Sequence, residues 1–468
     1  MKIIVNEEKL YDELVLILKL YYTEEEIESK DITFDISQDV KGDIINTMIK
    51  VTGEYNYIDF RSDKILNSRF PMKYHKRYSK LALYFALKKF NPTKFLPWGS
   101  LTGIRPTKLY YELLADNANS HFATINQFVN EFDVSLDKAE MCSKIIQNQN
   151  IERNDSFVDF YVNIPFCTTK CYYCSFISSP LSQCKQFVAP YIDALLKEID
   201  AAKAMIKDKG LKVKTMYVGG GTPTALTAEE LDMVLSALDY KVSEFTVEAG
   251  RPDTITKEKL DVLKKHGVTR ISINPQSFSN KTLKAIGRAH TAQDIIDTYK
   301  MAIPYDFSIN MDLIAGLNNE SFATFKKSVD MTIDCAPDNI TVHTLCIKKA
   351  SSLKENGGDI STEKNTEKMI TYSISALQKA GYKPYYLYKQ KNMIGNLENI
   401  GYFRDTPCVF NIDTMEEVCS IVACGANAIS KRYYVADNKI ERFANLKNLQ
   451  EYITRIDEMI EKKAKLFN

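Results

Sequence analysis

From residue 153 onward, the hydrophobic pattern alternates between short apolar runs and longer segments with helical periodicity. Residues 188–206 are the clearest helical segment, because apolar side chains recur there every three or four positions and form one face. Six alternating βα units predict an α/β fold with a parallel sheet and right-handed crossovers, curled into a partial (β/α)6 barrel over residues 153–350. The strand-like runs are 158–164, 215–218, 245–248, 269–273, 307–313 and 340–344.

The pattern before this region is mixed and predicts a separate N-terminal α+β accessory domain over residues 1–152. A chain of 468 residues exceeds the usual size of a single core, so two or three domains are expected. Helical periodicity covers 7–20, 78–90, 122–132 and 136–148, and strand-like runs cover 32–36 and 55–60.

Residues 351–468 predict a C-terminal α/β extension, which we expect to form a substrate-covering domain. Helical patterns cover 363–379 and 446–465. Between them, the stretch from Tyr382 to Tyr388 alternates like a strand and is rich in tyrosine. Such a strand suits either an aromatic surface for a flat ring system or a simple packed face, and the sequence leaves both open.

Composition and charge limit the expected partners and cellular compartment of the protein. Lys+Arg number 61 and Asp+Glu number 60, and this net charge of +1 favours neither a nucleic-acid nor a membrane-surface partner. No apolar run reaches the roughly 18 residues that a membrane span needs, and the N-terminus lacks a basic segment followed by a long apolar core. We therefore expect a cytoplasmic protein whose ten cysteines are reduced thiols or metal ligands.

One loop of the N-terminal region combines the only Trp with Gly, Pro and two cations. Its sequence over residues 96–108 is LPWGSLTGIRPTK. It is typical of a turn that docks one domain on the next. Alternatively, Arg105 and Lys108 meet an anionic substrate, because a guanidinium group matches a carboxylate bidentately.

Three cysteines follow the first strand of the predicted barrel on one short loop. Cys167, Cys171 and Cys174 have the spacing C-x3-C-x2-C, which suits a metal centre better than a disulfide framework. A zinc site would need a fourth ligand, and Cys184 is a poor candidate because it lies ten positions after Cys174. A four-iron cluster held by three cysteines instead leaves one iron open for a small molecule. A zinc site or a chance trio in a buried loop remains the alternative.

Several polar or glycine-rich motifs fall at the predicted carboxyl ends of the strands, where ligands of parallel sheets bind. A Gly219-Gly220-Gly221-Thr222 loop lets a ligand approach the backbone closely, yet no Lys follows it as in a nucleotide-phosphate loop. Asp312 lies inside an apolar strand, where it needs hydrogen-bond donors. The remaining candidates are Glu248, Gln276 and Arg288, and salt bridges within the barrel or a strand-end cap are the structural alternatives for the acidic and amide groups.

The stretch YVNIPFCTTKCYYCSF at 161–176 resembles the signature of the radical S-adenosylmethionine (SAM) superfamily, in the form found in oxygen-independent coproporphyrinogen III oxidases. With LTGIRPTK, EAGRPD and NMIGNLENIGY, the chain is most similar to the HemZ branch, the coproporphyrinogen dehydrogenases. The resemblance implies a [4Fe-4S] cluster on Cys167, Cys171 and Cys174, walled from water by Tyr172, Tyr173 and Phe176. It also implies a SAM pocket, with Tyr161 and Arg288 as candidates for catalytic roles. The implied SAM-pocket residues are Gly220, Gly221, Thr222, Glu248, Gln276, Arg288 and Asp312.

The family's activity implies oxidative decarboxylation of coproporphyrinogen III to protoporphyrinogen IX in haem biosynthesis, with an electron donor such as flavodoxin or ferredoxin. One feature departs from the oxidase pattern, because that branch carries a fourth cysteine two places after the third. This chain has Phe176 there, as in the haem-chaperone branch of the family. The alternatives are therefore a haem-binding or haem-trafficking protein that retains the cluster and, from another class, a radical SAM enzyme acting on RNA, which the near-neutral charge disfavours.

Overall fold

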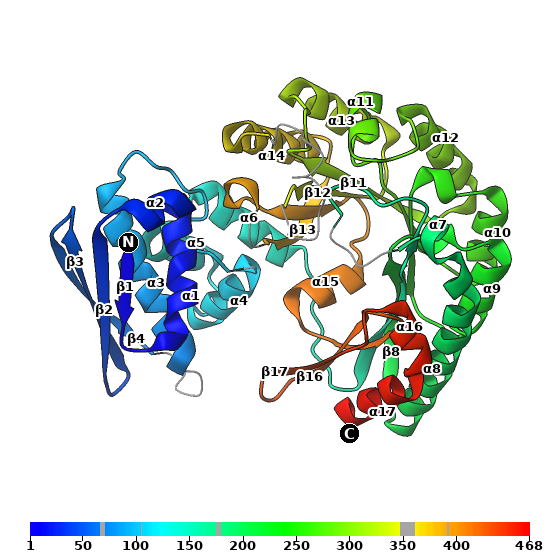
Figure 1. Cartoon of the computed structure of the whole chain (residues 1–468), viewed down its shortest axis with the longest axis horizontal. Coiled ribbons are helices and arrows are strands. Elements are labelled where there is room, and N and C mark those ends of the chain that lie inside the picture. Colours follow the sequence, from blue (N-terminus) through cyan, green and yellow to red (C-terminus); the bar gives the residue numbers. More distant parts are fainter. Residues whose placement is uncertain (66–70, 104, 175–178, 347–360, 391–392) are drawn as a thin grey trace. The chain divides into compact units, whose positions relative to one another are not determined.

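The computed structural model describes the chain apart from residues 66–70, 104, 175–178, 347–360 and 391–392. The chain divides into two compact units, Met1–Ser143 and Lys144–Asn468 (Figure 1). Each unit has its own hydrophobic core. Within the described residues, every helix is too short or too polar to cross a lipid bilayer.

The first unit is an α+β structure with a mixed sheet. Its strands pair in chain order, β1 parallel to β2 and the others antiparallel. Strand β3 was not predicted from the sequence, although buried residues alternate along it at Ile45, Thr47, Ile49 and Val51. The strands are β1 (Lys2–Val5), β2 (Ile32–Lys41), β3 (Ile44–Gly53) and β4 (Tyr57–Lys64). The helices are α1 (Tyr11–Tyr21), α2 (Glu24–Ser29), α3 (Pro71–Phe90), α4 (Pro106–Asp116), α5 (His121–Phe132) and α6 (Leu136–Gln147), the last continuing past Ser143.

The second unit is built on a sheet whose centre matches the predicted α/β fold. Strands β5, β8, β9, β10, β11 and β12 lie side by side in chain order and are all parallel. This confirms the predicted succession of six βα units. The bounds are β5 (Phe157–Ile164), β8 (Lys212–Gly220), β9 (Glu244–Gly250), β10 (Arg270–Ile273), β11 (Ser308–Ala315) and β12 (Asn339–Thr344).

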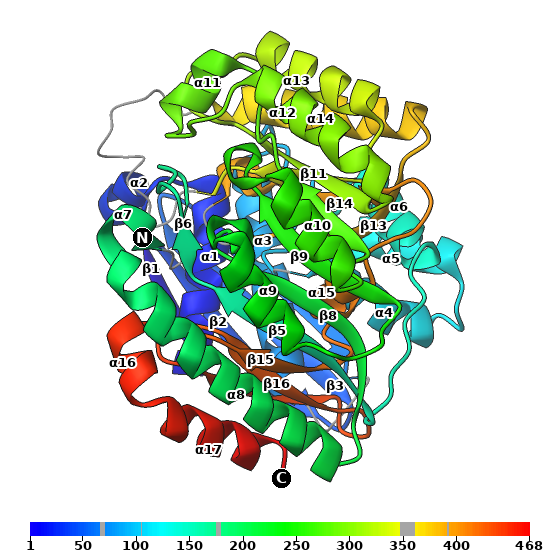
Figure 2. The same cartoon turned by 90° about the vertical axis from the view of Figure 1, so that its right-hand side faces the viewer.

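Helices cover one face of this sheet. In Figure 2, α8, α9 and α10 lie side by side in front of the strands. The even-numbered residues of β5, from Val158 to Ile164, belong to the core shared with these helices. Because side chains alternate along a strand, Asp159, Tyr161 and Asn163 face the opposite side. The helices are α7 (Leu181–Cys184), α8 (Val188–Asp208), α9 (Ala228–Ser236), α10 (Lys257–Lys265), α11 (Asn280–Ala285), α12 (Ala292–Ala302), α13 (Phe322–Cys335) and α14 (Glu363–Lys379).

The C-terminal segment extends the same sheet at both edges. β13 (Lys383–Tyr388) and β14 (Asn399–Phe403) add antiparallel strands beyond β12. β15 (Ser420–Cys424) returns to pair in parallel with β5, and an antiparallel hairpin of β16 (Ile429–Tyr434) and β17 (Lys439–Ala444) follows. The expected α/β extension therefore shares its sheet with the barrel strands, and its role in covering a substrate stays a prediction.

Three helices of this segment complete the unit. α15 (Val409–Glu416) precedes β15, while α16 (Leu449–Thr454) and α17 (Ile456–Leu466) end the chain. The prediction of one continuous helix over 446–465 was wrong, because the backbone at Arg455 leaves the helical conformation with φ −115° and ψ 26°. The break lets both helices pack against α8.

Candidate cluster and cofactor site

The cysteine loop begins directly after β5 and is anchored by backbone contacts. Cys167 lies in a two-residue strand, β6 (Phe166–Cys167), which pairs with β7 (Ser179–Pro180). Farther along, the amide N–H of Tyr172 donates to the carbonyl of Ile286 at 3.1 Å. Cys167 and Cys171 are buried and Cys174 is half-buried. The loop therefore holds three thiols in a sheltered position at the end of the first barrel strand.

The donor set of this loop fits a cluster better than a single ion. Three thiols can hold a four-iron cluster with one iron left open, whereas a structural zinc site needs four closed ligands. Cys184 is occupied elsewhere, since its thiol donates to the carbonyl of Pro180 at 3.2 Å.

The glycine loop lies against the first cysteine. A Cβ on Gly221 would stand 2.5 Å from the carbonyl oxygen of Phe166 and 3.1 Å from Cys167 Sγ. Gly220 has φ +114°, a conformation that side chains rarely adopt, and its Cβ would meet Asn163 Oδ1 at 2.2 Å. The Thr222 hydroxyl lies 3.4 Å from Cys167 Sγ. Only glycine fits this turn, which leaves bare backbone beside the cysteine loop.

Glu248 at the end of β9 reaches back to this glycine loop. Its carboxylate accepts hydrogen bonds from the Tyr217 hydroxyl at 2.6 Å and from the Gly220 N–H at 3.3 Å. Burial, together with the negative charge of Asp312, raises the pKa of Glu248 to about 7. The side chain can therefore accept hydrogen bonds as a carboxylate or donate one as an acid near neutral pH.

Gln276 and Asp312 are joined through their backbones. The Gln276 N–H donates to the Asp312 carbonyl at 2.8 Å, and Gln276 adopts the left-handed conformation with φ +65°. The Gln276 side chain is buried, and its Oε1 has no hydrogen-bond partner among the described residues. An orphaned amide oxygen at a strand end is a position that a bound ligand can satisfy.

Asp312 obtains its donors from the protein. Its carboxylate accepts from Asn310 Nδ2 at 2.8 Å and lies 3.7 Å from His343 Nε2. Burial opposes the charge, but the His343 and Asn310 contacts outweigh it and lower the pKa of Asp312 below its ordinary value. Asp312 is therefore a charged acceptor beside the less acidic Glu248.

Arg288 lies next to the cysteine loop. Its guanidinium donates to the Asn274 carbonyl at 2.6 Å and to the Tyr173 hydroxyl at 3.2 Å. Burial opposes the charge, yet Tyr173 and Cys171 raise the pKa of Arg288 above its ordinary value. Its Nε atom is buried with no hydrogen-bond partner among the described residues. Arg288 thus brings a permanent positive charge to the second cysteine.

Arg251 is a second cation at this cysteine, and it was not among the site residues predicted from the sequence. Its Nη1 lies 3.8 Å from Cys171 Sγ and donates to the Thr169 carbonyl at 3.2 Å. Two further bonds of 3.1 Å hold the Asp253 carboxylate, which also lies 3.4 Å from His290 Nδ1. The available signal was the cation three positions after the predicted strand, in EAGRPD.

Tyr161 stands on the inner face of β5 within an aromatic stack. Its ring stacks on Phe410 of α15 at 6.1 Å between centroids, and Phe410 also stacks on Tyr217 at 4.3 Å. The Tyr161 hydroxyl donates to Asn163 Oδ1 at 3.1 Å.

In the tyrosine-rich strand β13, Tyr385 and Tyr386 are buried, as expected if this strand forms a packed face.

The structure thus brings the predicted residues of the second unit to one region, and other candidates lie elsewhere. Arg105 precedes α4 and Lys108 lies in its first turn, both in the unit Met1–Ser143. Phe176, the predicted wall residue and branch marker, lies outside the described residues. The buried thiols of Cys408, Cys419 and Cys424, which the sequence analysis gave no role, are on the C-terminal segment.

The three thiols, the bare glycine turn and the orphaned polar atoms of Gln276 and Arg288 fit a [4Fe-4S] cluster with SAM beside it. A family model described as Radical SAM superfamily matches residues 161–332.

Two curated relatives are informative. The chain is 37% identical over 383 residues to the oxygen-independent coproporphyrinogen-III oxidase-like protein HemZ of Bacillus subtilis, covering 79% of this chain and 76% of that protein. It is 32% identical over 236 residues to the heme chaperone HemW of Lactococcus lactis, covering 48% of this chain and 60% of that protein.

Among solved structures, the coproporphyrinogen III oxidase HemN of Escherichia coli, a radical SAM enzyme, aligns with a TM-score of 0.54. The alignment covers 69% of this chain and 73% of that protein at 21% identity. At this identity the likeness shows a shared fold.

Proposed function

The chain belongs to the radical SAM family of oxygen-independent coproporphyrinogen-III oxidase-like proteins, and from this premise we propose that it converts coproporphyrinogen III to protoporphyrinogen IX. The family uses a [4Fe-4S] cluster and SAM. The main support for the proposal is structural: the cysteine loop, the glycine turn and the polar groups at the strand ends lie close together. The chain also aligns with HemZ over 79% of its length.

In this proposal, Cys167, Cys171 and Cys174 hold the cluster and leave one iron for SAM. The backbone of Gly220, Gly221 and Thr222 receives the methionine amine. Glu248, Gln276, Arg288 and Asp312 line the rest of the pocket, where carboxylates accept hydrogen bonds from ribose hydroxyls. When bound, the cluster and SAM supply a one-electron cleavage that generates a carbon radical able to remove a hydrogen atom from an unactivated position.

The protein's own residues bind and orient the substrate and shield it from water. In the net reaction each of two propionate side chains gives one hydrogen atom to the radical derived from SAM and one further electron to an external one-electron acceptor, releases CO2 and becomes a vinyl group. Two rounds complete the product, with a donor such as flavodoxin or ferredoxin supplying electrons to the cluster. Tyr161 and the stacked Phe410 and Tyr217 exclude water from the inner face of the sheet. Arg251 and Arg288 place positive charge beside Cys171.

A second candidate function is haem binding or trafficking without oxidase turnover. Two observations favour it: the similarity to heme chaperone HemW and the presence of Phe176 where oxidases carry a fourth cysteine. The porphyrin ring and its carboxylates are common to both functions, so the pocket alone does not separate them.

An anaerobic assay separates the two. The reconstituted protein is mixed with SAM, dithionite and coproporphyrinogen III, and both 5′-deoxyadenosine and decarboxylated porphyrin are followed by mass. The oxidase proposal expects both products, lost in Cys171→Ala and retained in Cys408→Ala, which removes a buried thiol outside the loop. Slow 5′-deoxyadenosine release with no vinyl product, together with stoichiometric haem binding, would overturn the oxidase proposal in favour of the chaperone.

A further inference from the structure

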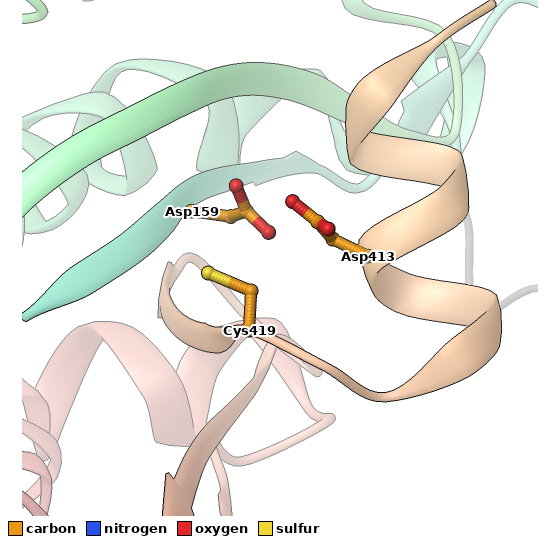
Figure 3. Close-up of side chains that lie close together, drawn as sticks. All are labelled: Asp159, Asp413 and Cys419. Atoms are coloured by element: carbon orange, nitrogen blue, oxygen red, sulfur yellow. The ribbon is translucent and has the colours of Figure 1, made fainter. Parts of the chain in front are cut away.

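A buried acidic cluster with one thiol lies away from the cysteine loop. It consists of Asp159 on β5, Asp413 on α15 and Cys419 directly before β15 (Figure 3). These residues are 0%, 1% and 5% exposed, respectively. One potential ligand atom from each lies within 4.8 Å of the other two. Figure 3 shows the two carboxylates facing each other, with the Cys419 thiol next to Asp159.

In each carboxylate, one oxygen accepts a hydrogen bond and the other oxygen has no hydrogen-bond partner among the described residues. The Thr215 hydroxyl donates to Asp159 Oδ1 at 2.7 Å, and the Lys214 ammonium donates to Asp413 Oδ2 at 2.6 Å. Asp159 Oδ2 and Asp413 Oδ1 are buried and have no hydrogen-bond partner among the described residues. Outer groups that hold the far oxygens of carboxylates are the usual second layer around a protein metal site.

With both carboxylates ionised, the charges around the cluster balance only when a proton or a further cation is bound there. Glu244 lies near both carboxylates but is occupied by the N–H groups of Val409 and Phe410. Lys214 therefore supplies one positive charge against two carboxylates and a potential thiolate. Burying unpaired charge of this kind is strongly unfavourable. Accordingly, burial raises the pKa of Asp413 to about 6 and raises the pKa of Asp159 well above its ordinary value.

We propose that Asp159, Asp413 and Cys419 bind one Zn²⁺ ion, at a site separate from the cluster and from SAM. A thiolate ligand selects zinc over Mg²⁺ or Ca²⁺, which prefer oxygen-only sites. Two carboxylates and one thiolate, less the charge of Lys214, carry a net charge of −2, which one divalent ion neutralises. Three protein ligands leave the fourth tetrahedral position to water.

Such an ion would join three parts of the unit. It would link the first barrel strand to α15 and to the start of β15, which pairs with that same strand. α15 carries Phe410, the residue stacked on Tyr161 and Tyr217. The zinc site would therefore fix the helix that closes the inner face of the sheet. This inference does not depend on the proposed oxidase activity.

The test measures zinc in the holoprotein directly. Full-length protein with its reconstituted iron–sulfur cluster is incubated with Zn²⁺, desalted and assayed for metals. We expect one zinc per chain in addition to the cluster iron. X-ray absorption at the zinc edge sees zinc alone, and we expect one sulfur at about 2.3 Å with two or three oxygens at about 2.0–2.2 Å. Three sulfurs would place the ion in the cysteine loop, and an oxygen-only shell would mean surface binding, so either overturns the proposal.

Variants test the named ligands. Asp413→Asn and Cys419→Ala should each lower retained zinc at least about tenfold, because each removes an anionic ligand. Cys408→Ala is the matched control, since it removes another buried thiol of the same segment and should retain zinc. Unchanged retention in Cys419→Ala would overturn the assignment. If a ligand variant fails to fold, the zinc-edge spectrum of the unaltered protein still decides whether one sulfur and two or three oxygens bind the ion.

Discussion

At the residue scale, Glu248 makes stability depend on pH in a direction opposite to most surface acids. Its pKa is raised from 4.5 to about 7, so the folded protein holds this proton more tightly than the unfolded chain. The contribution to stability is complete at low pH and is lost as the pH rises from about 4.5 to about 7. In Glu248→Gln we expect that loss to be absent, because the amide never ionises.

The measurement compares the thermal midpoint of SAM-free protein at pH 5 and pH 8. Glu248→Gln should exceed the unaltered protein in midpoint at pH 8 and match it more closely at pH 5. Glu258→Gln, at an exposed position in α10, serves as the control and should behave like the unaltered protein. An identical pH response in Glu248→Gln would show that this carboxyl does not titrate as argued.

Arg251 gives a second residue-scale prediction, on the potential of the cluster. Its guanidinium lies 3.8 Å from Cys171 Sγ, and a nearby positive charge stabilises the reduced, more negative state. Arg251→Gln should lower the reduction potential by on the order of tens of millivolts. Arg251→Lys keeps the charge and should shift it less. An anaerobic redox titration followed by electron paramagnetic resonance decides, and equal potentials in all three proteins would contradict the charge argument.

Arg251 also shows where residue-level prediction from sequence stops. The cysteine spacing is local, so the chain itself places Cys167, Cys171 and Cys174 on one loop. Arg251 reaches Cys171 across 80 positions of sequence, and only the order of the strands brings them together. Asp159 was not predicted as a site residue for the same reason: its partner Asp413 lies far away in the sequence, on a helix of the C-terminal segment.

At the element scale, regular alternation made the central sheet predictable. The predicted run 340–344 differs by one residue from β12 (Asn339–Thr344). Apolar runs between helical segments allow one sensible pairing order, since sequential βα units lie side by side. The return of β15 to β5 carries no such local signal, because any later strand could add to that edge. The sequence therefore predicted the existence of a C-terminal extension and not its place in the sheet.

The contact between α8 and α17 yields an element-scale prediction. Glu198 of α8 is fully buried and accepts hydrogen bonds from Gly425 N–H at 2.7 Å and Asn445 Nδ2 at 2.8 Å. Lys463 of α17 is its buried ionic partner. Lys463→Met should destabilise the protein by about 3–5 kcal/mol, because it leaves a charge buried without its counter-ion. Adding Glu198→Gln should recover part of that loss.

Urea unfolding of the single and double variants measures this coupling. Lys462→Met is the matched control on the next residue, since Lys462 pairs with Glu458 at the surface and should cost less than about 1 kcal/mol. A loss in Lys463→Met no greater than in Lys462→Met would mean that the buried pair does not hold the two helices together.

At the scale of the whole molecule, the division into two units separates the site from the N-terminal region. The predicted cluster and SAM residues all lie in the unit Lys144–Asn468, whereas Met1–Ser143 has a sheet and core of its own. Because α6 ends at Gln147, separating the chain after that residue keeps the helix whole. We expect residues 1–147 alone to unfold cooperatively and residues 148–468 alone to hold the cluster and cleave SAM.

Circular dichroism melting of each piece, with iron content and 5′-deoxyadenosine release for residues 148–468, tests this independence. Cleavage of SAM should persist because its proposed ligands are intact, and a matching Cys171→Ala change in residues 148–468 should abolish it. If the separated C-terminal piece folds yet takes up no cluster, the N-terminal unit supplies something that the cluster needs. If cleavage persists but porphyrin turnover is lost, the N-terminal unit acts on the substrate, and Arg105 and Lys108 become the first cations to replace.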